Sequence, residues 1–442
     1  MQAHLRQIER VNHIVNAIVT YAPEPALAAA LAADERQAHG APLGVLHGLP
    51  VAHKDLVETR GMRTTRGSPL FANWVPSVDA LIVQRLRAAG AIAVGKTNTP
   101  EFGAGSHTFN VVFGATRNPW DLSRTCGGSS GGAAVALACG MVPIADGSDL
   151  GGSLRNPGNF NNVVGFRPTL GRVPAWPSAR AWSGMSTLGP MARNVEDAAL
   201  MLSVVAGADP RAPAALTDSP DRFRDPLERD FRGARLAWSP DLGGLPVDPR
   251  VGAVLATALP AFTGFGCSVE EAAPDFTHAD DSFKALRAYA MTDLAPLLER
   301  QRDRIKATVA WNIEAGLRLT ALDVGTAEAR RTELYHRMRV FLETYEFLIC
   351  PVNQVPPFPL TVEYPREIGA ETMHTYIDWM KSCYFITVTG HPAISVPAGF
   401  TSDGLPVGVQ IVGRFGDDFG VLQLAYAFQQ ATGFGKLRPP IC

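Results

Sequence analysis

The stretch CGGSSGGAAVALA, residues 126–138, places Ser129 and Ser130 between two pairs of glycines and continues directly into small apolar residues. The apolar part predicts a helix over residues 131–141 whose small side chains let it pack tightly in the interior. A helix start needs only one capping serine, and a flexible loop needs fewer glycines. We therefore expect this turn to present its serines for chemistry.

The same turn matches G-x-S-x-G, the nucleophile elbow of many serine hydrolases, with Ser129 at the serine position. That elbow requires a strand directly before the serine. The preceding residues, RNPWDLSRTC, are polar and contain proline, which makes them poor strand material. The match is thus weak evidence, but a serine hydrolase with Ser129 as nucleophile and a distant histidine as base remains one alternative.

A second cluster, SDLGGSLR at residues 148–155, has two glycines directly before Ser153. Glycines let backbone N–H groups turn toward one point, where they can stabilise an oxyanion formed by attack of a serine. A serine nucleophile also needs a base, and no histidine is close to either cluster in sequence. Lys54, in AHKDL at the end of a predicted strand, could serve, because burial lowers a lysine pKa from about 10.4 toward neutrality. A serine between the two groups could relay the proton.

Helical and strand patterns alternate along the chain, which predicts α/β units around a largely buried sheet. A helix over residues 77–90, with Ser77 as its N-cap, precedes a short apolar strand at 91–95. The other predicted helices cover residues 23–40, 248–262 and 421–433, and the other predicted strands lie within 48–59, 234–239, 267–274, 347–352, 391–400 and 405–413. Residues 281–345 are charged and helical in pattern, as expected of a segment that covers the sheet.

The composition is that of a globular protein: 442 residues, 46% hydrophobic, 19% charged, with a net charge of −2. This charge predicts a small-molecule partner and argues against binding to nucleic acid or an anionic membrane. Six scattered cysteines without a metal-binding spacing indicate reduced thiols and a cytoplasmic location, with no metal site. The N-terminus has no apolar signal core, and no apolar stretch is long enough for a transmembrane helix.

Taken together, the motifs resemble the amidase signature enzymes. The resemblance rests on GLPVAHKDLVETRGMRTT, VGKTNTPEFG, the run from CGGSSGG to LGRVP, STLGPMARNVEDAAL and TGHPAISVPAGFTSDGLPVGVQIVG, and on the 24-residue spacing of Ser129 and Ser153. It covers most of the chain and is weakest over residues 210–380. It implies a single α/β/α domain over residues 1–442 around a mixed sheet, with a variable helical excursion at about 280–345. It implies amide hydrolysis without a cofactor, by a monomer or homodimer.

The resemblance also implies roles for individual residues. Ser153 would be the nucleophile, Ser129 a bridging serine in a cis peptide bond, and Lys54 the base. The backbone N–H groups of Leu150, Gly151, Gly152 and Ser153 would form the oxyanion hole, and Ser130, Asp149 and Arg155 would support the network.

Within this family, AHKDL resembles the stand-alone branch that includes nylon-oligomer hydrolases and urethane-cleaving enzymes. Small amides, and also aryl carbamates or esters, are therefore the expected substrates. The alternative is the amidase component of a tRNA-dependent amidotransferase, which would need a partner protein and glutamine. The motif stretches contain no basic cluster, which argues against a carboxylate-bearing substrate. Trp311, Tyr376 and Trp379 are candidates to line the pocket.

Overall fold

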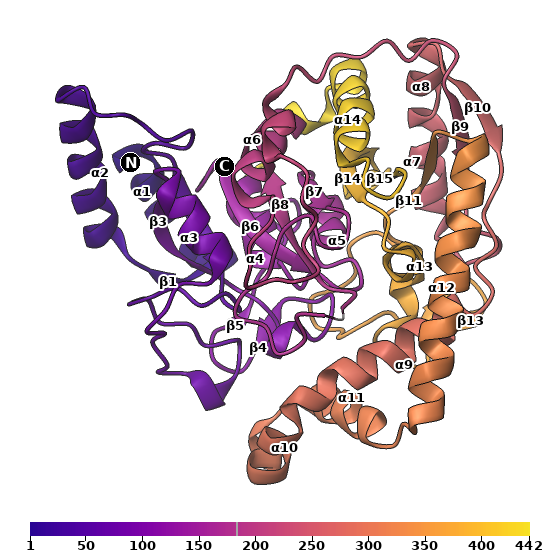
Figure 1. The fold of residues 1–442 in the computed structure, drawn as a ribbon, viewed down its shortest axis with the longest axis horizontal. Coiled ribbons are helices and arrows are strands. Elements are labelled where there is room, and N and C mark those ends of the chain that lie inside the picture. The colour runs from indigo at the N-terminus through magenta and orange to yellow at the C-terminus, as the bar shows by residue number, and fades with distance from the viewer. Residues whose placement is uncertain (183) are drawn as a thin grey trace.

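The computed structural model describes residues 1–182 and 184–442. An eleven-stranded mixed sheet runs through the molecule, with strands in the order β1-β3-β2-β6-β8-β7-β14-β15-β11-β9-β10. In Figure 1 its two edges, at β1 and at β10, lie at opposite ends of the molecule. The strands are β1 (Ile18–Tyr21), β2 (Pro50–Lys54), β3 (Ile92–Thr97), β6 (Ile144–Asp149), β7 (Val164–Arg167), β8 (Thr187–Ala192), β9 (Arg235–Trp238), β10 (Ser268–Glu271), β11 (Phe347–Pro351), β14 (Ala393–Phe400) and β15 (Pro406–Val412).

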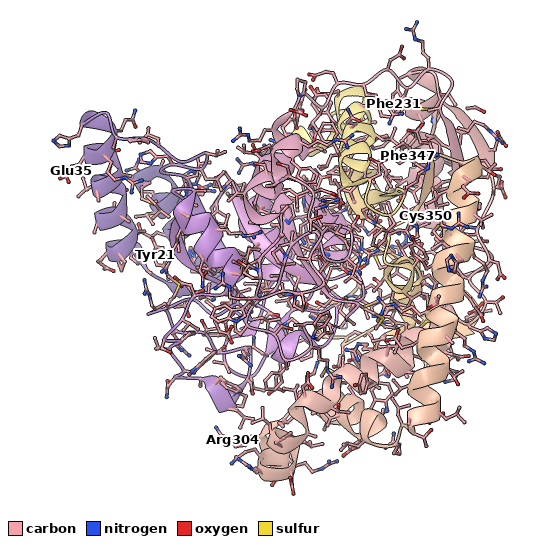
Figure 2. All side chains as sticks on the ribbon, viewed as in Figure 1. Tyr21, Glu35, Phe231, Arg304, Phe347 and Cys350 are labelled. Atoms are coloured by element: carbon pink, nitrogen blue, oxygen red, sulfur yellow. The ribbon has the colours of Figure 1, made fainter. Side chains whose placement is uncertain are left out.

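Both faces of this sheet are buried, as strand β11 illustrates. Phe347 and Ile349 belong to one apolar cluster, whereas Leu348 and Cys350 belong to another, because successive side chains of a strand point to opposite faces. Figure 2 shows Phe347 and Cys350 on this strand, with Phe231 packed near Phe347 at a ring distance of 6.3 Å. A strand buried on both sides carries apolar residues without alternation, which is why FLICPV was recognisable.

Two layers of helices enclose the sheet. The cluster around Phe347 is completed by one set of helices: α3 (Leu81–Ala88), α6 (Val195–Val205), α7 (Pro249–Ala258), α8 (Pro260–Gly264) and α14 (Asp418–Thr432). The other clusters contain residues of α1 (Gln2–Val15), α2 (Pro23–Ala38), α4 (Gly131–Ala138), α5 (Arg155–Phe160) and α13 (Lys381–Thr389). The predicted α/β/α class with a mixed sheet is therefore confirmed.

Residues 279–344 form consecutive helices: α9 (Ala279–Met291), α10 (Ala295–Gln301), α11 (Ala307–Leu317) and α12 (Ala321–Thr344). Figure 1 shows α9, α11 and α10 extending away from the sheet, with α10 at the tip, and α12, in orange, running back beside α13 toward β9. Arg304, labelled in Figure 2, lies at this same tip. Two small hairpins complete the chain, formed by β4 (Phe109–Asn110) with β5 (Gly114–Ala115), and by β12 (Glu367–Ile368) with β13 (Glu371–Thr372).

Helix α3 begins later than predicted, at Leu81 instead of near Ser77. The backbone N–H of Ala80 donates to the carbonyl of Glu58 at 2.8 Å, and the Asp79 carboxylate accepts from the N–H of Arg60 at 2.7 Å. These bonds to another segment hold residues 79 and 80 outside the helix. Ser77 is therefore not the N-cap.

Candidate active site

Two neighbouring parallel strands, β2 and β6, bring the polar residues of the site together. Because parallel strands end at the same edge of a sheet, Lys54 at the end of β2 lies close to Ser148 and Asp149 at the end of β6. Asp146 fixes this pairing: it accepts from the backbone N–H of Lys54 at 2.7 Å and lies 2.5 Å from Nδ1 of His53. All these side chains except that of Ser148 are buried.

The Lys54 amine lies among three serine hydroxyls. Its Nζ is 2.7 Å from Ser129 Oγ, 2.9 Å from Ser130 Oγ and 3.0 Å from Ser148 Oγ. Burial lowers the pKa of Lys54 to about 7, against the opposing attraction of Asp149 and Asp146. A lysine with this pKa is partly neutral at physiological pH and can accept a proton.

The turn that carries Ser129 is closely packed, which accounts for its glycines. A Cβ on Gly128 would lie 2.9 Å from Thr108 Oγ1, and one on Gly131 would lie 2.7 Å from Cys126 Sγ. The peptide bond between Gly128 and Ser129 is cis, as the resemblance implies. Only glycine leaves room for the backbone to pass at these positions and deliver Ser129 to the lysine.

The turn that carries Ser153 is held by the carboxylate of Asp149. This carboxylate accepts from the backbone N–H groups of Gly152 at 2.8 Å and Leu154 at 3.1 Å. The carboxylate three residues earlier therefore engages the Gly152 N–H, whereas the resemblance implies a place for this N–H in an oxyanion hole. In the part of the chain that the structure describes, the N–H groups of Leu150, Gly151 and Ser153 have no protein acceptor.

Asp149 and Arg155 form a fully buried ion pair, with Arg155 Nη2 and Asp149 Oδ1 2.9 Å apart. Burial alone would raise the pKa of Asp149, but Arg155 and Arg167 outweigh it and hold this pKa well below its usual range. The Arg155 guanidinium also donates to Gln410 Oε1 at 2.7 Å and to Thr387 Oγ1 at 2.9 Å. The pair thus ties the Ser153 turn to β15 and α13.

A cavity of about 160 Å³ opens onto Ser129, Ser148 and Ser153. Phe283, Arg287 and Met291 also line this cavity. These three residues lie four positions apart on α9, so they share one face of that helix. The helical segment after residue 278 thus supplies a wall of the candidate site.

Several of these residues were not predicted from the sequence. Ser148 stood within the quoted SDLGGSLR stretch, and its place three positions before the glycine pair was the available signal. No signal in the sequence marked Phe283, Arg287 or Met291, because a helix that lines a cavity has the same sequence pattern as one that packs on a core.

The remaining candidates from the sequence are a histidine base and three aromatic residues. Among the described residues, no hydrogen bond joins a histidine to Ser129 or Ser153, so the geometry gives the histidine-base alternative no support. Trp379 is buried in the core, and Trp311 is partly exposed. Tyr376 lies behind the cavity wall, where its hydroxyl accepts from Arg287.

The chain matches the family model described as Amidase over residues 1–422. It therefore belongs to the amidase family, the amidase signature enzymes, as the motifs indicated. Membership makes it an amide hydrolase.

Two curated relatives match along almost the whole chain. An acylamidase of Rhodococcus erythropolis is 37% identical over 442 residues, covering 99% of this chain and 92% of that protein. The A component of the glutamyl-tRNA(Gln) amidotransferase of Methylococcus capsulatus is 35% identical over 461 aligned residues, covering 99% of this chain and 94% of that protein.

Solved structures give the same result for the fold. A bacterial aryl acylamidase of the amidase signature family superposes with a TM-score of 0.91 at 29% identity, covering 98% of this chain and 93% of that chain. A 6-aminohexanoate cyclic dimer hydrolase, solved with its substrate, has a TM-score of 0.90 at 27% identity, covering 100% and 94%.

Proposed function

We propose that this protein hydrolyses small aryl amides through an acyl-enzyme on Ser153, with Lys54 as base and Ser129 as proton relay. The observation that carries the proposal is the 2.7 Å contact between the buried, low-pKa amine of Lys54 and Ser129 Oγ, beside the cavity that also exposes Ser153. The acylamidase and aryl acylamidase among its relatives support the substrate class.

The hydrogen bonds around the amine favour Ser129 as the relay. A neutral amine offers two N–H donors and one lone pair, so one of three serine hydroxyls must donate to it. Ser130 Oγ lies 3.4 Å from the carbonyl of Ser148, to which it can donate, and it then meets the lysine as an acceptor. Ser129 and Ser148 remain as donors, and Ser129 is the closer of the two.

The reaction would proceed in two halves. Lys54 draws a proton through Ser129 while Ser153 Oγ attacks the amide carbonyl, whose oxygen would be stabilised by the N–H groups of Leu150, Gly151 and Ser153. The relay returns the proton to the leaving amine, and water then releases the acid by the same route. Asp149 and Arg155 would act by holding the Ser153 turn, and Ser130 by orienting the lysine.

The test is release of aniline from acetanilide by the purified chain, with the Ser153→Ala variant as control. Release that equals the variant's background would overturn the proposal. Aliphatic amides, aryl esters and aryl carbamates in the same panel would define the range of substrates.

A second candidate function is that of the amidase component of a tRNA-dependent amidotransferase, which the 35% identity to the Methylococcus capsulatus protein favours. That role predicts glutamine hydrolysis and a stable complex with other proteins. A glutaminase assay and size-exclusion chromatography separate it from a stand-alone monomer or homodimer. The oligomeric state and the cytoplasmic location stay predictions of the sequence.

A further inference from the structure

Arg287 is a charged residue in the wall of the candidate site that the proposed reaction does not use. It extends from α9, and it lines the same cavity as Ser129 and Ser153. Only 6% of the residue is exposed, so its guanidinium has little access to bulk water. A buried charge is costly unless a partner compensates it.

The protein partners of this guanidinium are neutral. Nη1 donates to the side-chain oxygen of Asn312, and Nη2 donates to the hydroxyl of Tyr376 at 2.5 Å. The ring of Tyr376 adds a cation–π contact at 5.3 Å. Among the described residues no carboxylate lies within 4.0 Å of the Arg287 guanidinium.

The other buried arginines differ in this respect. Arg155 and Arg167 both contact the Asp149 carboxylate, and Arg172 is paired with Asp418 at 2.9 Å. Arg287 therefore stands apart as a buried arginine in the described residues that has a cavity in front of it instead of an acid.

Two acidic side chains close to α9 are paired with the same lysine. Asp280, two turns before Arg287, lies 3.0 Å from Lys284, and Asp378 lies 2.8 Å from the same lysine. Lys381 adds a second cation near Asp280, at 3.6 Å. These pairings leave the positive charge of Arg287 directed at whatever occupies the cavity.

We propose that Arg287 binds a carboxylate carried by the substrate, so that the amides hydrolysed here are anionic. This inference rests on the proposed function and narrows its substrate class. A guanidinium has five N–H donors in a planar fork, and the two neutral partners leave donors for the paired oxygens of a carboxylate. The proposal of an anionic substrate also replaces the expectation of a neutral one, which was based only on the motif stretches.

Two pairs of substrates test the proposal and locate the carboxylate. Succinanilic acid against butyranilide places the charge on the acyl side, and 4-acetamidobenzoate against acetanilide places it on the leaving amine. In the wild-type protein we expect kcat/KM for one of the acids to exceed that of its neutral partner by about 10- to 100-fold, the range for a hydrogen-bonded charge pair.

The decisive variant is Asn312→Asp, which keeps Arg287 and places a carboxylate directly on its guanidinium. It should abolish the preference for the acid while kcat/KM for the neutral anilide changes by no more than about twofold. Arg287→Met should also abolish the preference for the acid, and Arg287→Lys should retain part of the preference because it keeps the charge but loses the fork. Gln301→Glu, exposed on α10, adds the same charge outside the cavity and should leave the preference intact.

Each result has one meaning. If neutral anilides are hydrolysed but neither acid is favoured, or if the preference survives in both Asn312→Asp and Arg287→Met, the carboxylate site is wrong and the proposed amidase stands. If no anilide of either kind is hydrolysed, the proposed function itself fails. Thermal unfolding of each variant excludes loss of fold as the cause.

Discussion

The backbone N–H of Ser130 donates to the carbonyl oxygen of Ser153 at 3.2 Å. This bond joins two turns that are more than twenty residues apart in sequence, and it holds the hydroxyl-bearing residues of both at one cavity. Two serines at one site raise the question of which of them attacks.

We expect Ser153 to be the nucleophile. A serine-reactive fluorophosphonate should add one mass increment per chain, located at Ser153 by peptide mass spectrometry. The Ser153→Ala variant should take up no label, whereas Ser129→Ala should still be labelled, but more slowly, because it lacks only the relay. Label on Ser129 in the wild-type protein would reverse the two roles.

The pH dependence of the reaction rate should identify the base. Only neutral Lys54 accepts a proton, and the pKa of this lysine is about 7, so kcat/KM should fall as pH drops below that value. Lys54→Ala should reduce turnover by about 10²- to 10⁴-fold, the usual cost of losing a general base. Near-full activity of Lys54→Ala between pH 7 and 9 would place the base elsewhere.

Ser148 provides a matched control for the relay, since it contacts the same amine at 3.0 Å. Ser129→Ala should lose at least about tenfold more activity than Ser148→Ala, because only the first removes the proton path to Ser153. Steady-state kinetics on one anilide compares the two variants directly. Equal losses would show that both serines merely hold the lysine.

The buried Lys54 should also make the free energy of unfolding depend on pH. Its pKa of about 7 in the folded protein lies below the value of about 10.4 expected for the unfolded chain. Between these values the unfolded chain binds a proton that the folded protein lacks, so wild-type stability gains up to about 1.4 kcal/mol per pH unit from this group.

Lys54→Met lacks this contribution. Urea unfolding at several pH values should therefore show the free energy of unfolding of the wild type rising relative to Lys54→Met from pH 7 to pH 10. Lys96, whose pKa burial lowers to about 8, is present in both proteins and cancels in the comparison. Parallel curves would mean that Lys54 keeps an ordinary pKa.

Aryl carbamates should be substrates, but slower ones than matched anilides. Their carbonyl presents the same oxygen and the same C–N bond to the proposed oxyanion donors, but the second heteroatom donates electrons into the carbonyl and slows attack. Aniline release from methyl N-phenylcarbamate, compared with acetanilide, measures the difference. Release no faster than that of Ser153→Ala would restrict the protein to amides.

Most elements of the fold could be predicted where the local sequence preferences all indicate the same structure. Helix α2 and strands β2, β14 and β15 lie within their predicted ranges because propensity, burial and turn residues agree there. Strands β6 and β8 were missed, because glycine, proline and acidic residues in them are typical of loops. Their pairing with neighbours in the sheet outweighs those local preferences.

Some residues of the candidate site could likewise be predicted from the sequence, and others could not. Lys54, Ser129 and Ser153 could be found because their roles impose a spacing and a glycine pattern that the chain carries in its motifs. The position of the Gly152 N–H could not, since it depends on how the Asp149 carboxylate turns back. Arg287 could not either, because its partners, Asn312 and Tyr376, come from other helices and segments that no local pattern relates to it.

Most of the cavity lining comes from two parts of the chain: residues 56–153, which carry Ser129, Ser148 and Ser153, and helix α9. Changes in α9 can therefore alter which molecule is held without disturbing the bonds around Lys54. Substitutions in this one helix can change the selectivity for the bound molecule, in evolution or by design, and leave the serines and the lysine unchanged.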